Sequence, residues 1–177
     1  MLTIKFKGET YNLKNSVKEL TVGEFEDILI ILNKEDNVIN KWFEIFIRLG
    51  LSEEVINNIG LDEFKIIIRE FNFNTSNIVI KKSIKINGSE YKCFNSRFKL
   101  TVKNIIMIEN YILINPNKYI AEVIAILYTK EDEELNHFKV KFKADLIRNE
   151  VPATIAIPII NLLSKTFFSN LKTNIDE

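Results

Sequence analysis

The chain opens with an alternation of apolar and polar residues. Ile4 and Phe6 alternate with polar neighbours, Gly8 follows, and Tyr11 and Leu13 repeat the alternation. A period of two indicates a strand with one buried face. Glycine tolerates the positive φ of a tight turn, so this segment is predicted to form a β-hairpin.

The same pattern returns eighty positions later. Residues 3–22 align without a gap on residues 83–102, and nine of the twenty positions are identical. The identical pairs are Ile4/Ile84, Lys5/Lys85, Gly8/Gly88, Tyr11/Tyr91, Asn15/Asn95, Ser16/Ser96, Leu20/Leu100, Thr21/Thr101 and Val22/Val102. The second stretch carries Asn87-Gly88 at its turn, which also favours a tight hairpin. The repetition predicts a tandem duplication.

The predicted fold is α+β and pseudo-symmetric, with each unit made of a β-hairpin followed by three to four α-helices. The first unit is residues 1–73 and the second is residues 78–177, joined by the polar segment 72–77. An isolated hairpin is marginally stable. Each hairpin is therefore expected to pack on its own helices or to pair with the other hairpin in a shared sheet, and the two units together can form one compact domain.

Helical periodicity follows each hairpin. Thr21 and Glu24 fit a capping box at a helix start, and Thr101 begins the matching helix with Asn104 in place of the glutamate. The apolar positions predicted to face the core are Val22, Phe25, Ile28 and Leu32 in the first unit and Val102, Ile105, Ile108 and Ile112 in the second. A second helix is predicted from Ile39, Trp42, Phe43, Phe46 and Ile47, matched by Ile120, Val123, Ile124, Leu127 and Tyr128 after a break at 115–117.

The remaining segments match less closely. Ser52 is predicted to open a short helix that Gly60 ends, and Asp62 to cap another. Residues 137–142 alternate strictly, which predicts a strand. A helix is expected from Pro152 onward, and Pro158 should kink it or reset its start.

One C-terminal segment is apolar on nearly every side. Residues 151–163 contain a single polar pair, Thr154 and Asn161, and Phe167-Phe168 follow. A helix of this kind is buried all round, either within the fold or against a partner. The segment is the clearest indication in the sequence of an assembly component.

Composition narrows the classes of function. Lys plus Arg and Asp plus Glu each total 24, so the formal net charge is zero. Nucleic acid is not an expected partner, because the chain lacks a basic excess. Hydrophobic residues make up 46% of the chain, as expected for a buried core. The N-terminus lacks the apolar stretch of a signal peptide, and no run reaches the length of a membrane span, so a soluble protein is expected.

Candidate chemical groups are few. His137 is the single histidine, and Cys93, the single cysteine, is expected to be a small buried hydrophobe. The acidic run 131–134 lacks the alternating ligands of a calcium loop and is expected to be a solvated loop or helix start. Trp42, Tyr111 and the Tyr11/Tyr91 pair are interpreted as packing residues, and Lys139, Lys141 and Lys143 as a solvated face. We therefore predict no catalytic, cofactor-binding or metal-binding residue, no cofactor and no enzymatic activity.

The segment "IKFKGETYNLKNSVKELTVGEFEDIL" resembles the opening of small virion and tail-assembly proteins of tailed bacteriophages, in particular crAss-like and related Bacteroidetes phages. These begin with a strand, a glycine turn, a tyrosine strand and an LT-x-GEF helix start. The segment "FKADLIRNEVPATIAIPIINLLSKTFF" is similar to their C-terminal pattern. The resemblance covers most of the chain and transfers no catalytic residue.

The resemblance implies a structural or tail/neck-associated virion protein acting through protein–protein contacts. The expected partners are other phage structural proteins of the neck, tail or capsid, together with a homo-oligomer, and the expected location is the virion after assembly in the host bacterial cytoplasm. Two alternatives stay open. One is a tail-assembly chaperone absent from the finished virion, and the other is a regulatory binding module directed at the host.

Overall fold

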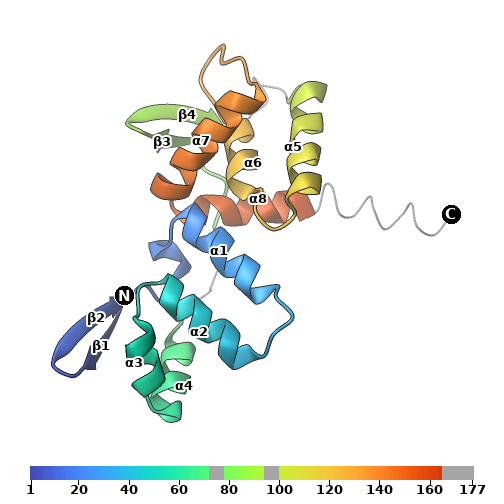
Figure 1. Cartoon of the computed structure of the whole chain (residues 1–177). Coiled ribbons are helices and arrows are strands. Elements are labelled where there is room, and N and C mark those ends of the chain that lie inside the picture. The colour runs from blue at the N-terminus through green and yellow to red at the C-terminus, as the bar shows by residue number, and fades with distance from the viewer. Residues whose placement is uncertain (72–77, 94–99, 165–177) are drawn as a thin grey trace.

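The computed structural model describes residues 1–71, 78–93 and 100–164. This part of the chain holds eight α-helices and two small antiparallel sheets (Figure 1). The first unit contains β1 (Leu2–Phe6), β2 (Glu9–Leu13), α1 (Val22–Leu32), α2 (Val38–Arg48), α3 (Glu53–Asn58) and α4 (Leu61–Glu70). The second contains β3 (Ser83–Ile86), β4 (Ser89–Cys93), α5 (Val102–Ile114), α6 (Ile120–Leu127), β5 (Tyr128–Thr129), α7 (His137–Glu150) and α8 (Ala156–Leu163). The predicted α+β class is confirmed.

Both predicted hairpins are present, and they have the same turn. Lys7 and Gly8 adopt φ values of 49° and 85°, and Asn87 and Gly88 adopt 47° and 71°. Positive φ at both central residues is the geometry of a two-residue turn whose twist matches that of the strands. Ile4 lies opposite Tyr11 in the first hairpin, and its counterpart Ile84 lies opposite Tyr91.

The two hairpins do not share a sheet. In the described chain, β1 and β2 form a two-stranded sheet, whereas β3 and β4 are joined by the short strand β5. Cys93 of β4 lies opposite Tyr128 of β5. The expected shared sheet is therefore not observed among the described residues. The strand β3 contacts α7, while Leu2, Ile4 and Phe6 of β1 are partly buried against the hydrophobic core. The strand β5 is an element that the sequence pattern did not predict.

Most predicted helix starts are confirmed. The Thr21 hydroxyl accepts a hydrogen bond from the Glu24 amide at 3.2 Å, and the Glu24 carboxylate accepts one from the Thr21 amide at 2.8 Å. Thr101 and Ser52 cap α5 and α3 through their hydroxyl groups. One prediction is wrong: α4 begins after Gly60, so Asp62 lies in the first helical turn instead of at the cap.

The prediction of a strand at residues 137–142 is also wrong, since this segment begins α7. A strand would have placed the three apolar residues of this segment on one buried face, but Phe138 and Phe142 are exposed and only Val140 is buried. Val140, Ala144, Ile147 and Val151 are all buried and recur at helical spacing. The Asn136 side chain caps the helix by accepting a hydrogen bond from the Lys139 amide at 2.9 Å.

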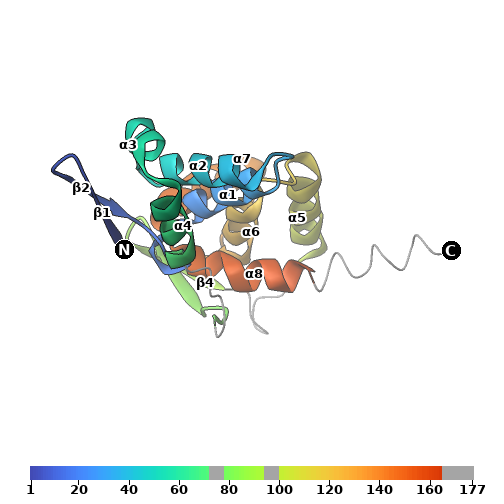
Figure 2. The same cartoon turned by 90° about the horizontal axis from the view of Figure 1, so that it is seen from below.

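The helices of the second unit surround α6. Figure 1 shows α5, α6 and α7 side by side, with α8 crossing below them, and Figure 2 shows α8 along one side of that group. All eight residues of α6 are buried. The helix α8 begins at Ala156, which puts Pro158 in the first turn, where its missing amide costs no helical hydrogen bond. Pro158 therefore resets the helix start.

The apolar C-terminal segment is buried mainly within the fold. Val151, Ala153, Ile155, Ile159 and Leu163 are at most 3% exposed. Leu162 is 44% exposed, and Phe167 and Phe168 lie outside the described residues. The burial expected of this segment is thus supplied largely by the protein's own core.

The helix α1 connects the two units. It packs on α2 of its own unit and on α6 and α7 of the other, and buried side chains of both units belong to one hydrophobic core. Its start is fixed to the C-terminal region, because the Val22 amide donates to the Val151 carbonyl at 2.8 Å and the Ala153 amide donates to the Leu20 carbonyl at 2.8 Å. The units are therefore packed together as one body.

The equivalent helix α5 lies at the edge of the molecule, and one core prediction fails there. Val102, the counterpart of the fully buried Val22, is 74% exposed. The helix α5 packs mainly on α6 through Met107, Ile108 and Tyr111, and Val102 points away from that face. Leu32, which was also predicted to face the core, is 38% exposed. Ile39 and Ile47, two of the apolar positions that predicted the second helix, are 58% and 42% exposed.

Candidate functional site

The most concentrated polar feature of the interior is a charged cluster where α1, α6 and α7 meet. Arg148 of α7 donates from Nε to Glu26 of α1 at 2.8 Å and from Nη2 to Glu122 of α6 at 2.6 Å. The second oxygen of Glu26 accepts the Ala121 amide at 3.0 Å. Glu26 is fully buried, and Glu122 is 8% exposed. One guanidinium thus holds two buried carboxylates from two different helices.

Burial and charge oppose each other in this cluster. Burial raises the pKa of Glu26, although the Ala121 amide and Arg148 act in the opposite direction. Burial also disfavours the charged form of Arg148, but the two glutamates outweigh it and keep the pKa of the guanidinium above its ordinary value. The cluster therefore holds a permanent cation whose charge stabilises the two carboxylates.

An open pocket of about 460 Å³ adjoins the charged cluster at Arg148. Its charged lining is Arg48, Lys118 and Arg148 against Glu24, Asp27 and Asp145. Asp27 pairs with Arg48 and, at 3.3 Å, with Lys118. Arg148 also donates to Asp145 at 3.2 Å. The opposite charges of the lining thus neutralise one another.

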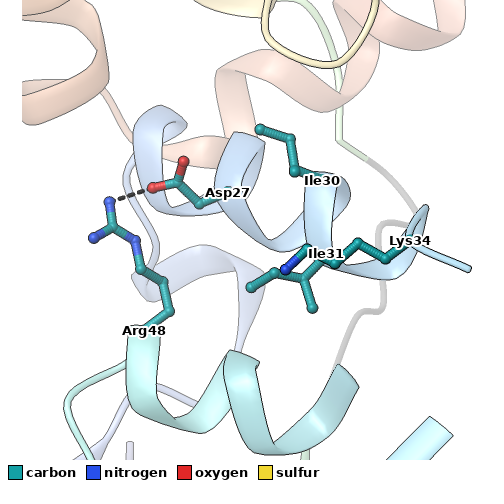
Figure 3. Close-up of a pocket in the computed structure, with 5 residues that line it drawn as sticks. All are labelled: Asp27, Ile30, Ile31, Lys34 and Arg48. Carbon is teal, nitrogen blue, oxygen red and sulfur yellow. Dashed lines mark hydrogen bonds and ion pairs between the residues drawn. The ribbon is translucent and has the colours of Figure 1, made fainter. Parts of the chain in front are cut away.

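A second pocket of about 340 Å³ adjoins the first through Asp27 and Arg48. Figure 3 shows its five lining residues on α1, α2 and the loop after α1, with the ion pair between Asp27 and Arg48 at one end. Ile30 and Ile31 form the apolar part of the lining. Lys34 pairs with Glu44 of α2. These contacts fasten α1 and the loop after it to α2.

Gly23 allows α1 and α7 to approach closely beside this cluster. A Cβ atom added to Gly23 would lie 2.9 Å from the Arg148 carbonyl oxygen and 3.1 Å from Arg148 Cβ. The first of these atoms is backbone and cannot rotate away. The close approach therefore depends on the missing side chain.

Gly23→Ala is expected to destabilise the protein by about 1–3 kcal/mol, the usual cost of overpacking. The same change in an unobstructed helix stabilises by about 1 kcal/mol, so the sign of the effect tests the contact. Urea unfolding followed by circular dichroism measures it. Lys103→Ala, at the exposed position aligned with Gly23, should change stability by less than about 0.5 kcal/mol. A stabilised Gly23→Ala variant would contradict the close approach.

A second buried cation lies between α7 and the three-stranded sheet. Lys143 is 4% exposed, and its Nζ donates to the Tyr128 carbonyl at 3.0 Å and to Glu133 at 2.9 Å. It also lies 4.9 Å from the centre of the Tyr91 ring. Burial lowers the pKa of Lys143, and Glu133 counteracts this shift. The ammonium group thus ties the loop before α7 to the sheet.

The lysines of α7 do not form the common face that the strand prediction implied. Lys143 is buried, whereas Lys139 and Lys141 are exposed. The acidic run 131–134 is a loop before α7, as expected, and within it Glu133 pairs with Lys143. The helical conformation separates residues that a strand would have placed together.

The other sequence candidates take part in packing. His137 is exposed, and its Nδ1 lies 3.1 Å from the hydroxyl of the buried Tyr111. Cys93 is partly buried next to Tyr128, whose pKa is raised by burial and by Cys93. Trp42 packs against Phe46 and Phe71, with ring centres 5.6 and 5.4 Å apart. The structure does not bring His137 and Cys93 together with the charged cluster.

Residues 1–71, 78–93 and 100–164 contain neither a metal-binding cluster nor a membrane-spanning helix. No group of three or more His, Cys, Asp or Glu side chains there could hold a metal ion. No helix in these ranges has the length and apolar character to cross a membrane. Comparisons of the chain with family models, curated proteins and solved structures gave no match.

The residues of the charged cluster were missed at the sequence level, although a signal was present. Glu122 stands alone in the apolar run 120–127, and Glu26 follows Phe25 on a helix face that is otherwise core. A charged residue inside an apolar helix needs a partner when it is buried. The signal gives no indication of which cation supplies that partner, because Arg148 lies 122 positions from Glu26.

Proposed function

We propose that the protein is a non-enzymatic component of a tailed bacteriophage, a structural or tail/neck-associated virion protein that acts through protein–protein contacts. The resemblance of its two sequence segments to phage virion and tail-assembly proteins supports this proposal. The proposed partners are neck, tail or capsid proteins of the same phage. The proposed location is the virion.

The observation that carries the proposal is the set of large exposed apolar side chains on each of two helices, α5 and α7. On α5, Val102, Ile106, Leu113 and Ile114 are between 50% and 80% exposed and recur at helical spacing. On α7, Phe138 and Phe142 are 80% and 62% exposed and lie one turn apart. Large apolar and aromatic side chains grouped on a surface are typical of binding sites for other proteins.

The hydrogen bonds and ion pairs of the interior support a binding role, because they hold in place the helix α7, which carries exposed apolar side chains. In the part of the chain that the structure describes, every buried polar side-chain atom has a hydrogen-bond partner. Arg148 joins α7 to α1 and α6, and Lys143 joins α7 to the preceding loop and the sheet. The helix that carries Phe138 and Phe142 is therefore held at its middle and near its C-terminal end, which lowers the entropy cost of binding through these side chains.

We further propose that the chain arose by duplication of a hairpin-and-helices unit. The matched hairpin turns, the shared cross-strand register and the threonine caps at positions 21 and 101 support this proposal. The different exposure of Val22 and Val102 fits a pair of units that later took different positions: α1 in the core and α5 at the edge.

Mass spectrometry of purified particles of the phage that encodes the chain tests the proposed function. We expect the protein in the particles at a fixed ratio to a tail or neck protein. A Phe138→Ser, Phe142→Ser phage should produce fewer complete particles, while a Val79→Ser phage, altered at a 75% exposed residue outside both helices, should assemble normally. Absence from particles despite a need for the gene would identify an assembly chaperone, and capture of mainly host proteins would identify a host-directed module.

A further inference from the structure

Within the described residues, β1 pairs with β2 on one side and has an unpaired edge on the other. Phe6 and Glu9 flank the two-residue turn, so they form a hydrogen-bonded pair, and such pairs alternate along an antiparallel ladder. Thr3 and Lys5 consequently belong to non-hydrogen-bonded pairs. Their amide and carbonyl groups point away from β2, toward the open side of the hairpin.

The second hairpin supports this assignment. In that hairpin β5 pairs with the outer edge of β4, whereas β3, the strand aligned with β1, is an edge strand of the described sheet like β1. The same alternation predicts that the backbone of Lys92 points outward from β4, and Lys92 is the residue that lies opposite Thr129 of β5. The chain therefore supplies a third strand to the second hairpin. The described chain supplies none to the first hairpin, which projects from the body of the molecule in both views (Figures 1 and 2).

The free edge of β1 opens into a groove. A cavity of about 240 Å³ is lined by all five residues of β1 and, on the opposite wall, by Ile59, Glu63, Ile66 and Ile67. Ile66 is 56% exposed although it faces this groove. A strand edge beside an apolar helix wall is a known arrangement for adding an extended strand.

We propose that β1 pairs in antiparallel fashion with β1 of a second copy of the chain, around a two-fold axis that passes by Ile4. In this register Thr3 of one copy lies opposite Lys5 of the other, so the outward backbone groups of both residues exchange hydrogen bonds. Leu2 lies opposite Phe6, and Ile4 lies opposite Ile4. A continuous four-stranded sheet results, and the interface is isologous.

The sequence of β1 favours a second copy over an unrelated strand. Leu2, Ile4 and Phe6 are partly buried and the two residues between them are exposed. An antiparallel pairing centred on Ile4 therefore matches apolar with apolar residues on one face and Thr3 with Lys5 on the other. A pairing centred on Lys5 would oppose two lysines, which is destabilising, and one centred on Thr3 would leave Phe6 without a partner.

The solution mass tests the proposal. Light scattering of the full chain should give a dimer, and Lys5→Pro should give a monomer, because proline removes an outward amide without removing a bond to β2. Lys85→Pro is the matched control: it removes the corresponding amide of β3, and this variant should stay a dimer. Circular dichroism and the fluorescence of Trp42 verify that both variants remain folded.

A cross-link tests the register. Ile4 and its symmetry mate form a non-hydrogen-bonded pair with a Cα separation of about 4.5 Å, within the range of a disulfide. Ile4→Cys in a Cys93→Ala background should therefore oxidise to a covalent dimer. Thr10→Cys in the same background should not, since three strand spacings, roughly 14 Å, separate its copies.

Two outcomes would overturn the proposal. One is a wild-type chain that remains monomeric at concentrations of tens of micromolar. If Lys5→Pro then abolished binding of this monomer to a different protein, the edge of β1 would be assigned to a strand of that protein. The other is a dimer that both proline variants leave intact and in which Ile4→Cys does not cross-link. Neither outcome depends on whether the protein belongs to a phage particle.

Discussion

Replacing Arg148 with methionine is expected to lower the free energy of unfolding by about 3–5 kcal/mol, the typical cost of removing one partner of a buried ion pair. The variant leaves the fully buried Glu26 and the nearly buried Glu122 without their shared cation. Urea unfolding at neutral pH, followed by circular dichroism, measures the loss. Asp145→Asn is the control, because this partner of Arg148 is 74% exposed and should contribute little.

The triple variant Glu26→Gln, Glu122→Gln, Arg148→Met distinguishes two causes of the lost stability: the unpaired buried carboxylates and the lost packing of the arginine side chain. Removing all three charges should recover most of the loss, since buried ion pairs are often replaceable by neutral groups of similar size. A triple variant as unstable as Arg148→Met alone would show that packing of the arginine stem dominates.

The loss in Arg148→Met should also depend on pH. The pKa of Glu26 lies above its ordinary value in the folded protein, so the folded state binds this proton more tightly than the unfolded state. The stability that protonated Glu26 contributes is therefore present at low pH. It decreases as pH rises from the pKa of Glu26 in the unfolded protein to its higher pKa in the folded protein. Removing the Arg148 charge raises the pKa of Glu26 in the folded protein further. The difference between variant and wild type should be largest near neutral pH and shrink on acidification toward pH 5.

Phe46→Ala is expected to cost about 3–5 kcal/mol of unfolding free energy, as for other large-to-small changes in cores. Phe46 has no exposed surface, and its ring centre lies 5.6 Å from that of Trp42 and 5.4 Å from that of Phe64. It thus joins α2 to α4, and a cavity there would weaken the contact between these two helices. The single tryptophan, Trp42, reports the change through its fluorescence in urea unfolding.

Phe138→Ala is the matched control for Phe46→Ala. It removes the same atoms from a side chain that is 80% exposed, so the change in stability should be within about 0.5 kcal/mol. Similar losses in the two variants would mean that Phe138 is buried in solution. A loss below about 1 kcal/mol for Phe46→Ala would contradict the aromatic core.

Local elements could be predicted from the sequence where local chemistry decides them. The turn at Asn87-Gly88 and the capping box of Thr21 and Glu24 depend on neighbouring residues, and both are present. The segment 137–142 shows the limit of this reasoning. Its alternation is an accident of two exposed phenylalanines, and the cap at Asn136 together with the spacing of later apolar residues determines the helix.

Long-range features could not be predicted from the pattern. The aligned positions Val22 and Val102 have equal hydrophobicity, yet one is fully buried and the other is 74% exposed, because α1 packs between the units and α5 packs mainly on α6. The charged cluster depends on the same packing, since Glu26 finds Arg148 only when α1 contacts α7. Periodicity specifies which face of a helix is apolar but does not specify what covers that face.

The position of α1 has a consequence for synthesis on the ribosome. Glu26 obtains its partner from Arg148, and the Val22 amide obtains its acceptor from Val151. Both partners are translated more than 120 residues after α1 begins. The first helix can form early, but its native surroundings cannot be completed until residue 151 has left the exit tunnel. A nascent chain paused before that point exposes the apolar face of α1 and is prone to aggregation.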